Sequence, residues 1–211
     1  MLKNDEILVI GKIGPKISVA LSKNNGRIKF IGSQSLLTLS VYKVNFYLND
    51  TTELVKIKES KFLYSFYPLV KNYQKYKAVS NVFRIINEIF PSFFESERIY
   101  EITLSYLNAL LKENENIEKL YVLWIYYVLW ILDEINHILF CKGCGSNLIK
   151  VYKVGEGSFC FSCRKKVDFE LEAFELELIK NMFKFNFDNI KNVRFDVKKF
   201  ITIFEDVISK L

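Results

Sequence analysis

Four cysteines, arranged as two Cys-x-x-Cys pairs, are the residues of this chain whose types and spacing best suit chemistry. Cys141 pairs with Cys144, Cys160 pairs with Cys163, and fifteen residues separate the pairs. In zinc ribbons, two tight turns at this spacing each contribute two sulfurs to one tetrahedral ion. Glycines flank Cys144 and precede the second pair, where the turns and the intervening hairpin need a permissive backbone. The pattern therefore predicts one structural zinc ion.

Other uses of the four cysteines fit this pattern less well. Disulfides are typical of small secreted scaffolds, and no signal-peptide pattern is apparent. A redox dithiol needs one Cys-x-x-Cys at a strand–helix junction rather than two matched pairs. A rubredoxin-like iron site uses similar ligands and stays open as an alternative. Four thiolates leave no open coordination position, so a metal here is expected to be structural.

Catalytic motifs are missing from the sequence. There is no His-Glu-x-x-His pattern, and the single histidine, His137, is interpreted as the last residue of an apolar helix. Neither a Gly-x-x-x-x-Gly-Lys-Ser/Thr loop nor a Gly-x-Ser-x-Gly elbow occurs. We therefore expect a binding protein and not an enzyme.

Length and composition allow one large domain or two small ones. Hydrophobic residues make up 50% of the 211 residues, which is enough for a sizeable core. The longest apolar run, Leu120–Leu132, is shorter than the roughly twenty residues of a membrane span, so it predicts a buried helix and no membrane association. No targeting segment is apparent, and we expect a reducing, cytoplasmic compartment.

The net charge of +6 is distributed unevenly along the chain. Residues 1–75 carry twelve Lys/Arg and five Asp/Glu, residues 76–140 carry five and nine, and residues 141–211 carry thirteen and ten. An acidic middle between basic ends indicates separate modules with separate surfaces. A basic N-terminal module would attract phosphate, although ordinary solvated lysines would give the same composition.

The first sixty residues are expected to form five short strands. Apolar or alternating segments are separated by turns, of which Asn25-Gly26 is a strong hairpin signal. Five short strands in a basic segment of this size favour a small closed barrel, for which the oligonucleotide-binding (OB) fold is a natural candidate. The expected strands are 7–13, 16–21, 27–31, 35–47 and 54–57.

Helices are expected to follow the strands. Periodic apolar residues predict helices at 82–90, with Ser80 as N-cap, and at 97–112. Segment 117–135 is expected to be the central buried helix, and 169–183 and 197–211 to be amphipathic helices. The sequence thus predicts an α+β protein: an OB-fold β-barrel at 1–75 and a helical domain at 76–211, with a zinc ribbon inserted at about 139–166.

This order of elements resembles the RecO family of bacterial DNA repair and recombination proteins. Segment 22–32 resembles the family's first hairpin, and segments 140–145 and 155–163 resemble its zinc segment. The resemblance of architecture covers nearly the whole chain. It implies a non-enzymatic mediator that binds single- and double-stranded DNA, anneals complementary strands, binds the acidic C-terminal tail of single-strand-binding protein, and with RecR helps to load RecA onto coated strands.

Candidate DNA contacts lie on the first strands and their turns. Basic side chains there would follow a phosphate backbone and release counterions, and aromatic rings would offer stacking faces to bases. Tyr47 offers such a face, whereas Phe46 belongs more naturally to the barrel core. The predicted DNA-binding residues are Lys16, Lys23, Arg27, Lys29, Lys43 and Tyr42.

A partner surface is expected on the helical part, about 78–138 with 167–211. The resemblance assigns binding of the single-strand-binding protein tail to this region. Such a tail is acidic and tipped with apolar residues, so it needs an apolar pocket rimmed by cations. The basic cluster Arg164, Lys165 and Lys166, or the lysines of 180–199, would supply that rim, unless they only solvate their own segments.

An RNA- or ribosome-associated protein that combines an OB fold with a zinc ribbon is the alternative function. An enzyme in which the ribbon is only a brace is the weakest of the three hypotheses, because the sequence offers no catalytic frame. Preference for single-stranded DNA or for RNA distinguishes the first two.

Overall fold

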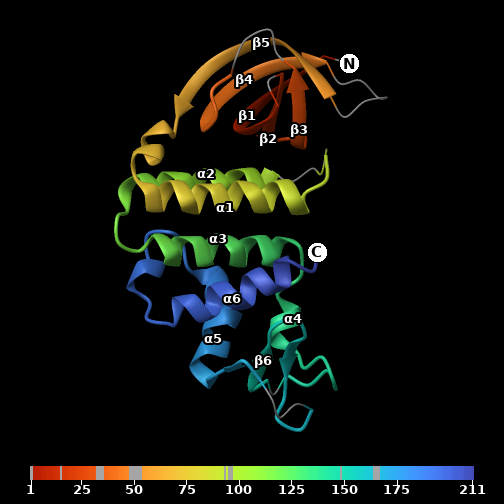
Figure 1. Cartoon of the computed structure of the whole chain (residues 1–211), viewed down its shortest axis with the longest axis vertical. Helices are drawn as coiled ribbons and strands as arrows, with labels where there is room; N and C mark the ends of the chain where they lie inside the picture. Colours follow the sequence, from red (N-terminus) through yellow and green to blue (C-terminus); the bar gives the residue numbers. More distant parts are fainter. Residues whose placement is uncertain are drawn as a thin grey trace. The chain divides into compact units, whose positions relative to one another are not determined.

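The computed structural model describes residues 2–14, 16–31, 36–47, 54–92, 94, 97–147, 149–163 and 167–211. The chain forms two compact units, Met1–Asn114 (unit 1) and Glu115–Leu211 (unit 2). A five-stranded sheet precedes most of the helices (Figure 1), so the predicted α+β class is confirmed. No helix among the described residues combines the length and hydropathy needed to cross a membrane.

The strands of unit 1 form one sheet in which every strand pairs with two others. The parallel pair is β3 with β5, and all other neighbours are antiparallel. The sheet closes on itself in the order β1-β2-β3-β5-β4. The long strand β5 curves strongly in Figure 1. The strands are β1 (Leu2–Ile13), β2 (Ile17–Ser22), β3 (Gly26–Ile31), β4 (Ser40–Tyr47) and β5 (Leu54–Ser65).

Alternate residues of these strands face inward and form a buried core, as the pattern of period two predicts. Ile7, Ile28, Phe30 and Phe46 belong to this core, so the interpretation of Phe46 as a core residue is confirmed. The expected strands overlap observed ones in all five places, but β4 begins only at Ser40, because Thr38 and Leu39 form a turn. However, β1 starts at Leu2 and β5 continues to Ser65, because both pair with β4 beyond their apolar segments.

A buried carboxylate fixes the turn between β2 and β3. Asp5 is only 3% exposed and accepts hydrogen bonds from the Ser22 hydroxyl and from the side-chain amides of Asn24 (2.8 Å) and Asn25 (2.6 Å). The turn ends at Gly26, whose φ of +62° favours glycine. The hairpin predicted from Asn25-Gly26 is thereby confirmed.

The helices of unit 1 are η1 (Tyr67–Lys71), α1 (Tyr73–Ile89) and α2 (Glu97–Lys112). The predicted bounds of α2 are confirmed. The predicted start of the preceding helix at Ser80 is wrong, because Asn72 caps α1 by accepting a hydrogen bond from the Lys75 backbone N–H at 3.1 Å.

Both long helices of unit 1 are tied to the sheet. The Arg27 Nε donates to the Phe90 carbonyl at 2.7 Å, and the Tyr100 hydroxyl donates to Glu6 Oε1 at 2.8 Å. The last strand ends at Ser65, ten residues before the predicted domain boundary at 75. Because the following helices contact the sheet, the compact unit extends to Asn114.

Unit 2 is built around α3 (Ile117–Ile131), which is buried on almost every side, as predicted for the central helix. The predicted end at 135 is wrong, because the chain leaves the helix after Ile131, where Asp133 has a φ of +60°, and His137 lies in a separate short helix. Helix α6 (Val197–Ile208) packs along α3, and the Phe204 ring lies 6.2 Å from the Tyr126 ring between centroids. The expected helix at 169–183 is shorter, because Phe169 and Glu170 form strand β8 beside β6. The remaining elements are α4 (Asn136–Leu139), β6 (Val151–Lys153), β7 (Gly157–Phe159), α5 (Ala173–Asn181), η2 (Met182–Lys184) and η3 (Ile190–Asn192).

Candidate metal centre and nucleic-acid interface

The four cysteines converge on one point in unit 2. Their sulfur atoms all lie within 4.8 Å of one another, and the Sγ atoms of Cys144 and Cys160 are 3.8 Å apart. A tetrahedral ion with metal–sulfur bonds of about 2.3 Å separates its ligands by about 3.8 Å. The donor set and its spacing therefore fit one metal ion held by four thiolates.

Tight turns position the two cysteine pairs. Gly145 N–H donates to the Cys141 carbonyl at 2.7 Å, and Cys163 N–H donates to the Cys160 carbonyl at 3.1 Å. A Cβ atom on Gly143 would lie 3.0 Å from both the Cβ and the Sγ of Cys163, so a side chain there would push the two turns apart by a few tenths of an ångström. Glycine at this position therefore lets both pairs reach the same ion.

A small sheet joins the two turns. β6 pairs with β7 in a hairpin and with β8 on its other side. The backbone N–H of Lys142 donates to the Ser158 carbonyl at 2.9 Å, and the Ser158 hydroxyl donates to the Ile138 carbonyl at 2.7 Å. These bonds connect the first turn to β7 and to α4, so the metal ligands are set by secondary structure rather than by free loops.

The environment of the thiols favours a cation. Burial raises the pKa of Cys141, but hydrogen bonds from the backbone N–H groups of Cys160, Cys144 and Gly143 outweigh it and lower the pKa to about 6. Hydrogen bonding to the other three thiols, Cys160 first, raises the pKa of Cys163 to about 12. One thiolate thus raises the pKa of its neighbours and disfavours their ionisation. A bound cation would lower the pKa of all four thiols and stabilise the thiolates.

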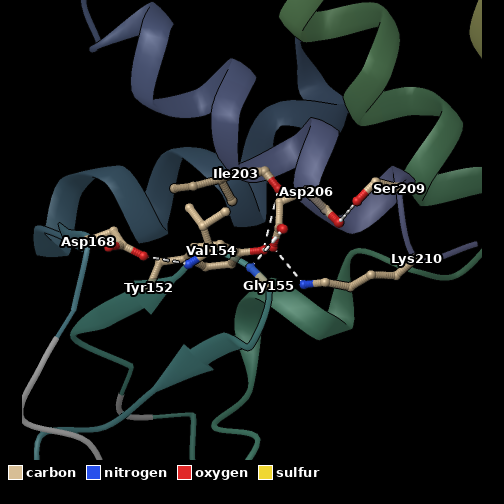
Figure 2. A network of polar contacts seen from close by, with 8 residues as sticks. All are labelled: Tyr152, Val154, Gly155, Asp168, Ile203, Asp206, Ser209 and Lys210. Carbon is tan, nitrogen blue, oxygen red and sulfur yellow. Dashed lines mark hydrogen bonds and ion pairs between the residues drawn. The ribbon is translucent and has the colours of Figure 1, made fainter.

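Asp206 ties the hairpin to helix α6 (Figure 2). Its carboxylate accepts hydrogen bonds from the Tyr152 hydroxyl (2.7 Å), the Gly155 N–H (2.8 Å) and the Lys210 ammonium (2.6 Å). The Asp206 side chain is only 8% exposed. Burial raises its pKa, but the bonds from Lys210, Tyr152 and Gly155 outweigh burial and hold the pKa below its ordinary value. The hairpin between the cysteine pairs is therefore part of the same packed structure as α6.

Replacing Asp206 by alanine is expected to lower the unfolding free energy by about 2 kcal/mol at pH 7. The Tyr152 hydroxyl and the Gly155 N–H would lose their acceptor. Because the native pKa is depressed, the stabilisation is full above about pH 4 and is lost as the pH falls through the native value. Urea denaturation at pH 7 and at pH 3 measures the difference, which should shrink in acid.

An exposed aspartate of the same unit supplies the control. Asp188 lies in a turn at the surface, so Asp188→Ala should change stability little at either pH. A loss in Asp206→Ala that is the same at both pH values would contradict a charge-dependent role for the carboxylate.

The predicted DNA contacts have different surroundings. Lys16 and Lys43 are exposed, and Lys29 is half-buried in β3. Lys23 Nζ lies 3.1 Å from Glu97 Oε1, and that hydrogen bond is the main reason why its pKa is raised. Arg27 donates to the Phe90 carbonyl, so Lys23 and Arg27 both bind the helices of unit 1. Sequence reasoning missed these internal partners, which leave Lys16 and Lys43 as the more accessible cations.

The stacking role predicted for Tyr42 is wrong. Tyr42 is 6% exposed, its ring packs edge-to-face against Phe62 at 5.7 Å between centroids, and its hydroxyl accepts a hydrogen bond from the Leu37 N–H at 3.1 Å. The residue alternates inward on β4 with Phe46, so its faces are enclosed by the core. Tyr47 is 46% exposed and keeps an accessible ring.

The cations proposed for a partner surface are only partly described. Arg164, Lys165 and Lys166 lie outside the described residues. Within 180–199, Lys199 is paired with Glu175 at 2.6 Å and is largely buried, whereas Lys180 and Lys191 are exposed. Lys199 is therefore engaged in an internal ion pair.

Sequence reasoning also missed a pocket of about 540 Å³ beside the first cysteine turn. It lies among α4, that turn and the end of α6. Apolar groups of Phe140, Val207 and Leu211 line it together with the cations Lys142 and Lys210, and with Glu134 and Glu156. Phe140 is apolar and yet 46% exposed. The sequence could not predict this pocket, because Phe140 and the C-terminal residues meet only in the folded chain.

Comparisons with known proteins leave the family open. No protein-family model matches the chain, and no curated protein sequence matches it.

Proposed function

We propose that this chain is a RecO-like mediator of DNA repair and recombination. It binds single- and double-stranded DNA, anneals complementary strands and, with RecR, helps to load RecA onto strands coated by single-strand-binding protein. The observation that carries the proposal is one combination: a closed, basic five-stranded sheet, then helices, then four clustered cysteines that begin ten residues after the long buried helix.

The sheet of unit 1 is proposed to be an OB fold. Support comes from its five strands, its closure and its pairing order β1-β2-β3-β5-β4. Lys43 and Lys61 face each other directly across β4 and β5, and both are exposed. Glu6 faces Lys43 from β1 and compensates part of this charge, but both lysines stay exposed, which supports a phosphate-binding role for this face.

Zinc is the metal that we propose for the four cysteines. Four thiolates in a tetrahedron suit zinc, and the spacing of the pairs is that of structural zinc sites. When bound, the ion would supply folding free energy, with no open position for chemistry. Iron suits the same donor set. Metal analysis of freshly purified, reduced protein distinguishes the two ions.

The annealing reaction tests the proposed function. Purified protein should speed the pairing of complementary DNA strands that carry single-strand-binding protein. It should also bind single-stranded DNA more tightly than RNA of the same sequence. Tighter binding to RNA, with no effect on annealing, would favour an RNA-associated protein instead.

The pocket beside the first cysteine turn is the place that we propose for the tail of single-strand-binding protein. An acidic tail with an apolar tip suits an apolar pocket with Lys142 and Lys210 at its edge. Lys210 also binds Asp206, so Lys142 is the more available cation.

Reversing the charge of Lys142 tests this placement. Lys142→Glu should weaken binding of a fluorescent tail peptide about tenfold, because a favourable charge contact becomes a repulsion. Lys150→Glu is the matched control, since Lys150 is exposed on the same ribbon but is absent from the residues that line the pocket. Titration at low salt measures both affinities, and equal weakening by the two variants would count against the pocket.

A further inference from the structure

Five exposed side chains lie where the sheet of unit 1 passes into its first helices. We call this group the η1–α1 surface: Tyr67, Lys71, Tyr73, Tyr76 and Lys77. The three tyrosines are 61%, 76% and 48% exposed. Large aromatic residues are mostly buried in monomeric proteins, so three exposed rings within ten residues are characteristic of an interaction site.

The geometry of α1 places three of these side chains on one face. Tyr73, Tyr76 and Lys77 are spaced i, i+3 and i+4, so they are neighbours on the helix surface. Tyr67 and Lys71 belong to η1, which packs against α1. The opposite side of α1 carries its buried residues, including Val79 and Val82. The tyrosine rings are therefore outside the core and have no packing role that would explain their number.

The segment that carries the rings has charges of one sign. No Asp or Glu occurs between Glu59 and Glu88. Lys75 is buried and its Nζ donates to the Leu111 carbonyl at 3.4 Å, so this lysine serves the fold. Lys71 and Lys77 are exposed, and neither forms an ion pair with any residue in the part of the chain that the structure describes. The surface thus combines accessible rings with uncompensated cations.

We propose that the η1–α1 surface binds single-stranded DNA. Aromatic rings stack on bases without regard to sequence, and lysines beside them neutralise the phosphates between stacked bases. The inference rests on the proposed function and extends it, because it assigns single-strand binding to helical residues that lie outside the closed sheet. A duplex keeps its bases stacked on one another, so the tyrosines favour single strands over double strands.

Removal of the three rings is the main test. The triple variant Tyr67→Ala/Tyr73→Ala/Tyr76→Ala should bind fluorescent oligo(dT) at least about tenfold more weakly, since stacking of one base alone contributes on that order. Binding to a duplex of the same length should change much less. Replacing the same three residues by phenylalanine keeps the rings and should keep the affinity.

Two further variants separate stacking from charge and from general surface effects. Lys71→Ala/Lys77→Ala should lower the salt dependence of single-strand binding by about 1.4 in log–log slope, because each phosphate contact contributes about 0.7. Lys180→Ala/Lys191→Ala removes two exposed lysines of unit 2 and is the control for charge. Phe174→Ala/Phe183→Ala removes two exposed rings of unit 2 and is the control for exposed aromatics.

The outcomes distinguish this inference from the proposed function. A wild-type protein that binds no oligo(dT) would reject both. Wild-type binding that the alanine triple variant retains in full would overturn the η1–α1 surface alone, as would an equal loss for single strands and duplex. Vesicles containing phosphatidylserine are the comparison ligand: a variant that loses only vesicle binding would assign the surface to a membrane and overturn the proposal.

Discussion

Replacing Cys141 by serine is expected to release the metal and to unfold the hairpin around it. Cys141 is the most buried of the four ligands, at 2% exposed, and it accepts a hydrogen bond from the Cys160 N–H at 3.3 Å. Serine cannot supply the thiolate, and the free energy of metal binding is also folding free energy, about 10–16 kcal/mol in zinc peptides. Elemental analysis should find about one metal ion per wild-type chain and almost none in Cys141→Ser.

Unfolding measurements should show a large loss in the same variant. Both tryptophans, Trp124 and Trp130, belong to α3, so their fluorescence reports on unit 2. Ser162→Ala is the matched control, because Ser162 is exposed between two ligands and can change without loss of a thiolate. Fresh, reduced wild-type protein without metal would contradict the metal centre. Cys141→Ser with wild-type stability would contradict its structural role.

Features that depend on a few neighbouring residues could be predicted from the sequence. The spacing of the cysteines was enough to predict the cluster, because each pair needs only one tight turn. Asn25-Gly26 led to the β2–β3 hairpin, and the periodic pattern of 97–112 led to α2 with its observed bounds. In each case the local pattern and the tertiary structure favour the same conformation.

Features that depend on distant residues were missed. Asn72 caps α1 next to a short 3₁₀ helix. The apolar pattern of 82–90 does not indicate that the helix starts nine residues earlier, at Tyr73. Phe169 and Glu170 continue the apolar spacing of α5, yet they pair with Val151 and Tyr152 of β6. Strand pairing removes these residues from the helix, and that pairing depends on the hairpin that carries the cysteines.

Dependence on distant residues also explains why the DNA contacts were only partly predicted. A lysine or arginine on a basic segment looks available for phosphate until its partner is known, and Lys23 has Glu97 as that partner. Tyr42 is polar at its tip and was expected to be accessible, but the inward alternation of β4 encloses it. Tyr73 and Tyr76 precede the helix predicted at 82–90, and the structure places them on the exposed side of α1. Exposure therefore decided these roles more than residue type did.

Gly26→Ala is expected to destabilise unit 1 by about 3 kcal/mol or more. The φ of +62° costs roughly 1–2 kcal/mol for a residue with a Cβ atom. In addition, that Cβ atom would lie 1.8 Å from the Phe94 carbonyl oxygen, which belongs to backbone and cannot rotate away. The adjacent Arg27 holds this segment through its bond to the Phe90 carbonyl and its bridge to Ser92, so relief would require breaking those contacts.

Two other glycines separate backbone strain from steric collision. Gly14 has a φ of +65° but nothing within 4 Å of an added Cβ atom, so Gly14→Ala should cost only the strain. Gly11 has open space and no positive φ, so Gly11→Ala should be nearly neutral. Urea denaturation followed by circular dichroism should rank the losses in the order Gly26, Gly14, Gly11. If Gly26→Ala cost no more than Gly14→Ala, the segment at Phe94 would yield easily, and the close approach that joins the β2–β3 turn to the start of α2 would contribute little to stability.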